Sequence, residues 1–195
     1  MQKKDIRHLA KEELMAFLKE RGEKAFRYKQ IMEWVWIKNA ASIDAMTSLP
    51  LSLRQALDQA FFISKPLISA EQQSSDGTRK YAFSLADKLM VEAVLIPAGS
   101  RTTACISTQV GCALACKFCA TAKLGFKRNL EYFEIYDQIA FVNARSEEYY
   151  GHKLNNVVYM GMGEPLLNIE NTLKSLERVS SPEAFAMSPK RITVS

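Results

Sequence analysis

The chain has 195 residues, of which 48% are hydrophobic and 24% charged, and its formal net charge is +5 at pH 7. These values are ordinary for a globular protein and exclude a disordered tail, a collagen-like repeat and a low-complexity linker. No segment approaches the roughly 18 apolar residues of a membrane span, and the N-terminal run MQKKDIRHLAKEEL lacks the apolar core of a signal peptide. We therefore expect a cytoplasmic protein with no membrane association.

The first 64 residues are predicted to be a compact helical segment. Apolar residues recur at three- and four-residue steps over 9–18, and a second apolar stripe runs over 26–38. A third helix is expected to begin with Ser52 as its N-cap.

The pattern changes to strands after residue 64. The turn signal SDG at 75–77 precedes the run RKYAFSL. A second turn signal, ADK at 86–88, separates that run from LMVEAVLIP. This arrangement predicts a small antiparallel hairpin or meander within 66–97.

From residue 101 onwards, strand patterns alternate with helix patterns. The predicted order is strand 103–110, helix 131–148, strand 155–163, helix 168–179 and strand 191–195. Such alternation predicts right-handed βαβ units, a parallel sheet and an α/β fold. Because a parallel sheet that stops on a short third strand leaves an exposed edge, we expect this chain to be the N-terminal portion of a longer protein.

All four cysteines lie between Cys105 and Cys119, a crowding that does not fit a disulfide framework. Cys112, Cys116 and Cys119 form C-x3-C-x2-C in the loop after the first predicted parallel strand, where open α/β folds bind ligands. Three cysteines can hold a 4Fe–4S cluster and leave one iron open. The alternative is a structural zinc site made by all four cysteines, although only one of the two usual C-x2-C knuckles is present.

The residues around these cysteines carry only positive charge. No acidic residue occurs between Ala93 and Leu130, and this stretch contains Arg101, Lys117, Lys123, Lys127 and Arg128. Such an excess would stabilise an anionic cluster or bind a phosphate backbone. The aromatic Phe118 is expected to shield the cluster from water.

The string CISTQVGCALACKFCATAKLGFKRNL, followed by VVYMGMGEPLLN and RITVS, resembles the RlmN/Cfr family of radical S-adenosylmethionine (SAM) RNA adenine methyltransferases. The run FRYKQIMEWVWIKNAASIDAMTSLPLSLR is similar to the accessory helical domain of that family. The resemblance implies an accessory, RNA-contacting domain over 1–64 and a β-hairpin connector over 65–100. Residues 101–195 would then be the first half of a partial (βα)6 radical SAM barrel, truncated after about three strands.

The resemblance also implies an activity, partners and cofactors. RlmN-type members methylate carbon 2 of an adenine in 23S rRNA at the peptidyl-transferase centre and in tRNA beside the anticodon. They use a 4Fe–4S cluster and SAM, and we expect a monomer that takes electrons from a flavodoxin-like donor. Cfr-type members methylate carbon 8, and overall similarity favours the carbon 2 type. A zinc-stabilised, non-catalytic RNA-binding module is the alternative from another class.

The family's functional residues match positions of this chain. The resemblance implies that the cluster ligands are Cys112, Cys116 and Cys119, and that SAM is bound by Gly163, Glu164 and Ser195. It implies that Glu92 accepts a proton and that Cys105, as a thiolate, releases the product with formation of a disulfide bond. From the residues alone, Gly163 also fits a strand-end turn, Glu92 a solvent-facing strand residue and Cys105 a buried strand cysteine.

In that family, a cysteine near the C-terminus carries the methyl group before its transfer to RNA. No cysteine follows Cys119 here. We therefore expect this chain to bind a cluster without methylating RNA.

Basic and aromatic residues are interleaved near the N-terminus. Residues 1–40 contain ten Lys or Arg and six Asp or Glu, with Phe26, Tyr28, Trp34 and Trp36 among them. The combination suits a structured RNA partner through phosphate contacts and stacking. The simpler interpretation of the two tryptophans is that they belong to the helical core.

Overall fold

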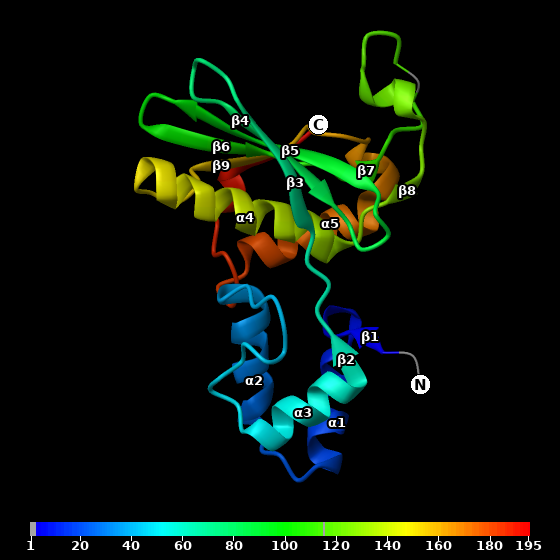
Figure 1. Cartoon of the computed structure of the whole chain (residues 1–195), viewed down its shortest axis with the longest axis vertical. Coiled ribbons are helices and arrows are strands. Elements are labelled where there is room, and N and C mark those ends of the chain that lie inside the picture. Colours follow the sequence, from blue (N-terminus) through cyan, green and yellow to red (C-terminus); the bar gives the residue numbers. More distant parts are fainter. Residues whose placement is uncertain (1–2, 115) are drawn as a thin grey trace. The chain divides into compact units, whose positions relative to one another are not determined.

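A computed structural model describes residues 3–114 and 116–195. Its contacts divide the chain into two compact units. The first contains the residues up to Ser64 together with Pro182–Phe185, and the second contains Lys65–Ser181 and Ala186–Ser195 (Figure 1). Among the described residues, no helix has both the length and the apolar character needed to cross a bilayer.

The first unit is helical apart from a short parallel strand pair, β1 with β2. Its elements are β1 (Lys4–Asp5), η1 (Ile6–His8), α1 (Lys11–Glu20), α2 (Phe26–Met32), η2 (Glu33–Ile37), α3 (Leu51–Ala60) and β2 (Phe61–Phe62). The predicted N-cap at Ser52 is wrong. Helix α3 begins at Leu51, because the Pro50 carbonyl already accepts the first helical bond, from the Arg54 N–H at 3.0 Å.

The two tryptophans are parts of the first unit's own packing. Trp36 is 3% exposed, so its interpretation as a core residue is confirmed. Trp34 is half-buried and donates its indole N–H to Ser48 Oγ at 2.7 Å, while the Lys38 ammonium lies 4.1 Å from its ring centroid. Both rings are therefore engaged within the unit.

A buried ion pair ties the start of the first unit to its end. Asp5 and Arg7 are both buried, and Arg7 Nη2 donates to Asp5 Oδ2 at 2.8 Å. Asp5 Oδ2 also accepts the Ser64 N–H at 2.8 Å, and Arg7 donates to the Ser64 carbonyl. Burial raises the pKa of Asp5, but the hydrogen bonds and charge of Arg7 outweigh it and lower this pKa below its usual value.

Replacing Asp5 by asparagine is expected to destabilise the first unit by about 3 kcal/mol, because the Arg7 charge then stays buried without a counter-charge. Urea unfolding followed by tryptophan fluorescence measures this, since both tryptophans lie in that unit. The matched control is Asp58→Asn in the exposed Lys3–Asp58 pair, with an expected cost below about 1 kcal/mol. Equal costs for the two variants would contradict the assignment.

The same ion pair predicts an acid sensitivity. Because the pKa of Asp5 is lower in the folded protein than in the unfolded one, its contribution to stability is complete above the unfolded pKa. That contribution is lost as the pH falls through the folded pKa.

The second unit is a six-stranded sheet with two long helices. Its elements are β3 (Leu67–Gln73), β4 (Arg79–Ser84), β5 (Met90–Ala98), β6 (Arg101–Cys105), β7 (Gln109–Val110), η3 (Thr121–Leu124), β8 (Arg128–Asn129), α4 (Tyr132–Tyr150), β9 (Asn156–Tyr159), η4 (Pro165–Asn168), α5 (Ile169–Ser180), η5 (Pro189–Arg191) and β10 (Ile192–Val194). The strand order is β10-β9-β6-β5-β4-β3, and β7 pairs separately with β8.

The predicted βαβ units are confirmed. Strands β6, β9 and β10 are parallel, with α4 between the first two and α5 between the last two along the chain. Strands β3, β4, β5 and β6 are antiparallel neighbours in the same sheet. The predicted hairpin region and the first parallel strands thus form one continuous sheet, and the fold of this unit is α/β.

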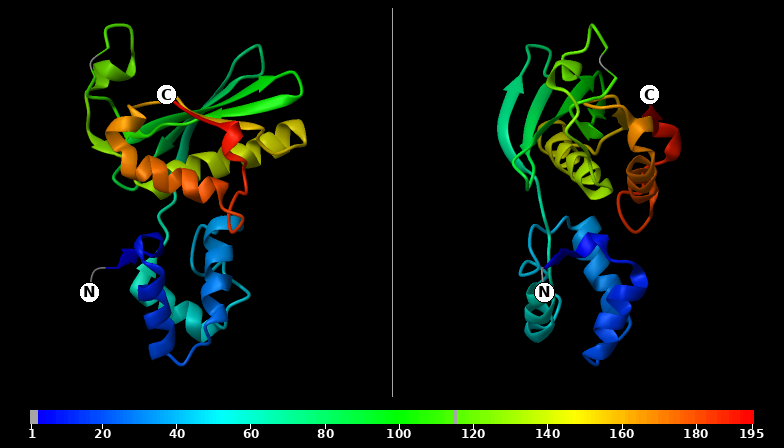
Figure 2. Two further views of the ribbon diagram at one scale, coloured as in Figure 1. Left: turned by 180° about the vertical axis from the view of Figure 1, so that it is seen from behind. Right: turned by 90° about the vertical axis from the view of Figure 1, so that its right-hand side faces the viewer.

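Helices α4 and α5 lie side by side on one face of the sheet (Figure 2). On that face, alternate strand residues such as Tyr81, Val91 and Ala104 are fully buried. Phe141 of α4 makes an edge contact with the Tyr81 ring at a centroid distance of 5.1 Å. The other face, which no described helix covers, carries the remaining strand residues and is half-exposed.

Two predicted strands are shorter than expected. The strand predicted over 103–110 breaks after Cys105, and the one predicted over 155–163 ends at Tyr159. The first break has a physical reason. Ser107 directs its backbone N–H to Gln138 Oε1 on α4 at 2.9 Å, and its carbonyl accepts from Gln138 Nε2 at 3.1 Å. A side-chain amide thus replaces the neighbouring strand.

Candidate active site

The carboxyl ends of the parallel strands lie along the same side of the sheet, and most of the predicted site residues lie there. Cys105 is the last residue of β6, and its neighbours across the sheet are Val94 of β5 and Val158 of β9. Glu92 lies two residues from Val94, so it shares the half-exposed face with Cys105. The open face at the carboxyl edge therefore holds both predicted catalytic side chains.

Cys105 is half-buried. Burial raises the pKa of its thiol, and the backbone N–H of Met160, which donates to the sulfur, acts in the opposite direction. Met160 directly precedes the GMGEP segment, 161–165. The structure thus places the Cys105 sulfur beside the segment predicted to bind SAM.

Glu92 is half-exposed and forms an ion pair with Lys80 at 3.1 Å. Its backbone carbonyl accepts a 2.6 Å hydrogen bond from Ser107 Oγ, and the same hydroxyl accepts the Met162 N–H at 2.9 Å. Ser107 thereby connects β5 to the GMGEP segment.

The glycines of GMGEP allow two close backbone approaches. A Cβ on Gly161 would lie 2.6 Å from the Ile106 carbonyl carbon and oxygen. Gly163 has φ +95°, and a Cβ there would lie 2.5 Å from Gln109 Cβ. Both positions therefore require glycine, because the chain that follows β6 packs against them. A tight turn at the end of a strand makes the same requirement.

Glu164 is half-buried, and its backbone and its side chain bond to different residues. Its N–H donates to Gln109 Oε1 at 2.8 Å, and its Oε1 accepts the Leu166 N–H at 3.2 Å at the start of η4. In the described part of the chain, no partner contacts its Oε2. One carboxylate oxygen is thus free for a cationic ligand group.

The cysteine loop, residues 111–127, is closed at its base by the β7–β8 pair. Lys127 donates its N–H to the Val110 carbonyl at 2.9 Å. Gly111 has φ +72°, and a Cβ there would lie 1.7 Å from the Gly125 carbonyl oxygen. Two glycines thus let the two ends of the loop approach.

Cys112, Cys116 and Cys119 all lie on this loop as free, partly exposed thiols, as does Cys105 on β6. The Ala122 N–H, followed by the contacts of Thr121, lowers the pKa of Cys119. Ala115, inside the C-x3-C spacing, is outside the described residues. Within 3–114 and 116–195, no three His, Cys, Asp or Glu side chains are arranged to hold a metal ion.

Three free thiols on one loop are a donor set that fits an iron–sulfur cluster. In the described residues the three sulfurs are not arranged around one metal position, so cluster binding requires the loop to rearrange. No disulfide joins any of the four cysteines in this structure. The four-cysteine zinc alternative gains no support, because Cys105 belongs to β6 and lies outside the loop that carries the other three cysteines.

Three other predicted site residues have distinct settings. Ser195 follows β10 and is exposed, as is Phe118 at 94%, so Phe118 shields nothing in this arrangement. Arg128 forms ion pairs with Asp87 at 2.6 Å and Glu134 at 2.7 Å. These pairs withdraw Arg128 from the predicted cationic surface. Lys117, Lys123 and Lys127 have no ion-pair partner in the described parts of the chain.

Sequence reasoning missed the residues that hold this edge together. They are buried and polar, and each bonds backbone groups of another segment: Ser107, Gln109, Gln138 and Asn168. The available signal was the polar trio STQ inside an otherwise apolar predicted strand. Buried polar groups require partners, so this trio indicated structural hydrogen bonds.

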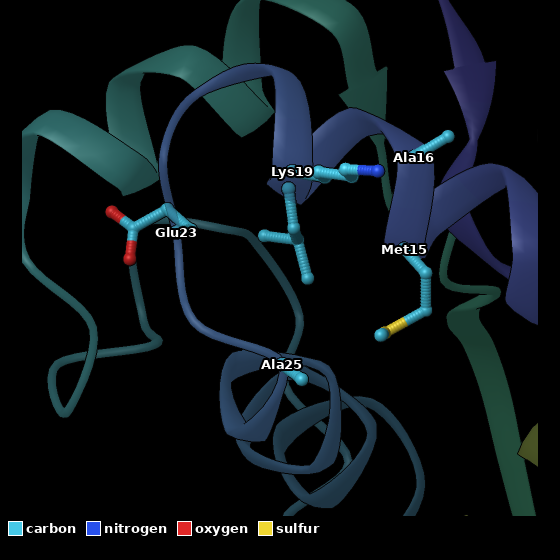
Figure 3. Close-up of a pocket in the computed structure, with 6 residues that line it drawn as sticks. Met15, Ala16, Lys19, Glu23 and Ala25 are labelled. Atoms are coloured by element: carbon cyan, nitrogen blue, oxygen red, sulfur yellow. The ribbon is translucent and has the colours of Figure 1, made fainter.

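A hollow of about 320 Å³ in the first unit lies between α1 and the start of α2 (Figure 3). It is lined by Met15, Ala16, Leu18, Lys19, Glu23 and Ala25. None of the predicted site residues lines it, and its two charges are opposite in sign. All of the predicted catalytic, SAM-binding and cluster-ligand residues belong to the second unit.

Comparisons with known proteins give concordant relatives. Residues 4–63 match a family model described as "Ribosomal RNA large subunit methyltransferase N-terminal domain". The chain is 52% identical over 193 residues to the probable dual-specificity RNA methyltransferase RlmN of Christiangramia forsetii, covering 99% of this chain and 55% of the relative. The dual-specificity RNA methyltransferase RlmN of Syntrophus aciditrophicus is 43% identical over 195 residues, which cover 100% of this chain and 56% of that protein.

A solved structure shares the fold. The crystal structure of a radical SAM methyltransferase from Sphaerobacter thermophilus matches with a TM-score of 0.85 and 37% identity, over 97% of this chain and 56% of that one. The chain spans about half the length of the curated relatives it matches.

Proposed function

We propose, because the chain belongs to the RlmN family, that it forms the cluster- and SAM-binding part of a radical SAM RNA methyltransferase. The observation that supports this most directly is the pairing of Cys105 with Val158, three residues before the GMGEP segment begins. It brings a candidate nucleophile next to a glycine-rich segment with a free carboxylate oxygen. The expected partial barrel would enclose this half-exposed face.

In this proposal, Cys112, Cys116 and Cys119 hold a 4Fe–4S cluster. Bound there, the cluster supplies the electron that cleaves SAM reductively. Gly163 and Glu164 hold the amino group of SAM, because a carboxylate is a suitable partner for an ammonium and a glycine permits close approach. Ser195 adds a hydroxyl contact from the end of β10.

Glu92 and Cys105 are proposed to act on the RNA base. Glu92 accepts the proton from the ring carbon, which neutralises its carboxylate and releases Lys80 from the ion pair. Cys105 attacks, as a thiolate, the sulfur of the methyl-carrying cysteine of the family's route. A disulfide forms as the bond from that sulfur to the transferred carbon breaks, and the carbon keeps the electron pair and takes up a proton to become the methyl group of the product. Since burial raises the pKa of Cys105, that thiol must first lose its proton to a base.

The proposed substrates are an adenine of 23S rRNA and an adenine of tRNA, methylated at carbon 2. The target base must leave its stack to reach the site, so a flipped or unpaired base is expected. The proposal places this activity in the cytoplasm. Nucleosides of RNA from cells with and without the protein are compared by liquid chromatography with mass spectrometry, in which retention against standards separates 2-methyladenosine, the expected product, from the carbon 8 isomer of equal mass.

The direct test of the site is anaerobic iron–sulfur reconstitution of the 195-residue chain. Electron paramagnetic resonance of the reduced protein is then recorded with and without SAM. A reduced-cluster signal that changes when SAM is added is the expected result, because it requires an iron without a protein ligand. Stoichiometric zinc with no cluster under any reducing condition would refute the proposal and leave the RNA-binding module.

A further inference from the structure

Gln109 occupies a position that the proposed chemistry does not use. It is the first residue of β7, between the end of β6 and the cysteine loop, and it is 1% exposed. A buried amide has donors and an acceptor that must be satisfied within the protein. Its partners therefore show what the side chain connects.

The two ends of the Gln109 amide contact two different segments. Its Oε1 accepts the Glu164 N–H at 2.8 Å, and its Nε2 donates to Asn129 Oδ1 at 2.8 Å. Glu164 belongs to GMGEP, whereas Asn129 belongs to β8 at the base of the cysteine loop. One side chain thus spans the distance between both segments.

The backbone fits closely around the same side chain. Gly163 packs so near Gln109 that any Cβ would overlap it, at 2.5 Å from Gln109 Cβ and 2.8 Å from its backbone nitrogen. The Gln109 N–H also donates to the Met162 carbonyl at 3.2 Å. A second buried amide, Asn168, donates to the carbonyls of Thr108 and Leu130, both at 2.8 Å, and reinforces the connection.

We propose that Gln109 is a positioning residue that fixes the GMGEP segment relative to β8, and so sets where Glu164 stands with respect to the base of the cysteine loop. Its contact with Glu164 is through the backbone, which leaves the free Glu164 oxygen to face a ligand. This inference rests on the proposed function only in taking SAM as that ligand.

The test is Gln109→Met, which keeps the length of the side chain and removes both hydrogen bonds. Loss of the acceptor frees the Glu164 N–H, so its amide hydrogen exchange is expected to accelerate about tenfold relative to the amides of β5. The matched control is Gln138→Met, which removes an equally buried amide that bonds Ser107 and Glu134 but not GMGEP. Equal acceleration at Glu164 in both variants, or none in Gln109→Met, would overturn the proposal.

A second measurement separates positioning from loss of the fold. In the reconstituted chain, Gln109→Met is expected to weaken SAM binding about tenfold while the iron content per chain stays that of the wild type. Asn129→Ala removes the β8 end of the connection, together with a 3.4 Å bond from Asn129 Nδ2 to the Leu167 carbonyl, and should weaken SAM binding in the same direction but less. A parallel loss of iron and SAM binding in either variant contradicts a positioning role.

The outcomes also distinguish this inference from the proposed function. If the reconstituted wild type fails to bind SAM, the proposed function falls, and the exchange of the Glu164 amide still decides whether Gln109 fixes the segment. If the wild type binds SAM and Gln109→Met binds it equally well, only the positioning role falls.

Discussion

Replacing Cys116 by serine is expected to reduce cluster content from about one per chain to background, whereas Cys105→Ser is expected to leave it unchanged. Cys116 stands between Cys112 and Cys119 on the loop, and all three are free thiols. Serine is a poor ligand for iron in such clusters, and two thiolates do not hold one. Iron and acid-labile sulfide per chain after anaerobic reconstitution are the measurements.

Cys105→Ser is the control because it removes a thiol of the same chain without touching the loop. Cys105 lies in β6 between β5 and β9, outside the loop that carries the other three cysteines. A zinc site made by all four cysteines predicts the opposite pattern, since each substitution then removes one ligand. Equal loss of metal in the two variants, with zinc in the wild type, would overturn the assignment.

The order of elements was predictable from the sequence because its signals are local. In β5 the half-exposed Glu92 lies between the buried Val91 and Ala93, and α4 has an acidic cap at Glu131 and a left-handed glycine at Gly151. The parallel arrangement followed from the strand–helix alternation. The cysteine spacing likewise indicated a shared loop, and the structure places all three cysteines on it.

The break after Cys105 was not predictable from local pattern. Residues 103–110 have the composition of one strand, but the partner that ends the strand is Gln138, 31 positions further along the chain. The polar trio at 107–109 indicates buried hydrogen bonds, but nothing in the strand itself shows that the partner is a side chain of α4. The same holds for Arg128, whose ion pair with Asp87 joins residues 41 positions apart.

The roles of the glycines were likewise only partly predictable from the sequence. Gly163 was predicted as a residue of the SAM site on its motif, and the structure adds a packing reason that sequence alone does not reveal, the overlap with Gln109. Gly111 carried no expectation at all, although its environment is the most restrictive of the chain's glycines in the space available for a Cβ. Close approaches between distant segments are tertiary facts, and they decide where a small residue is obligatory.

Gly111→Ala is therefore expected to have the largest effect of any single methyl group added to the second unit. The new Cβ would lie 1.7 Å from the Gly125 carbonyl oxygen, a backbone atom that no rotamer change can move. Relief requires β7 and β8 to separate, with loss of the bond from the Lys127 N–H to the Val110 carbonyl. The left-handed φ adds a strain of about 1–2 kcal/mol for a non-glycine residue.

Gly151→Ala is the matched control, because Gly151 has the same φ of +72° and a Cβ there would meet no atom within 4 Å. Both substitutions carry the same left-handed strain, so their difference isolates the close approach at Gly125. We expect Gly151→Ala to cost about 1 kcal/mol in urea unfolding and to keep full cluster content. For Gly111→Ala we expect amide exchange at Lys127 and Leu130 to rise sharply and iron content after reconstitution to fall.

The iron content of the Gly111→Ala chain measures the effect of this substitution on the proposed cluster site. The β7–β8 pair holds the base of the cysteine loop on one side and, through Gln109, the GMGEP segment on the other. If β7 and β8 separate, the base of the loop is no longer held in place, although all three cysteines are still present. A Gly111→Ala chain that binds as much cluster as Gly151→Ala would show that the loop gathers its three thiols independently of this base, and the expected role of the β7–β8 pair in cluster binding would then be wrong.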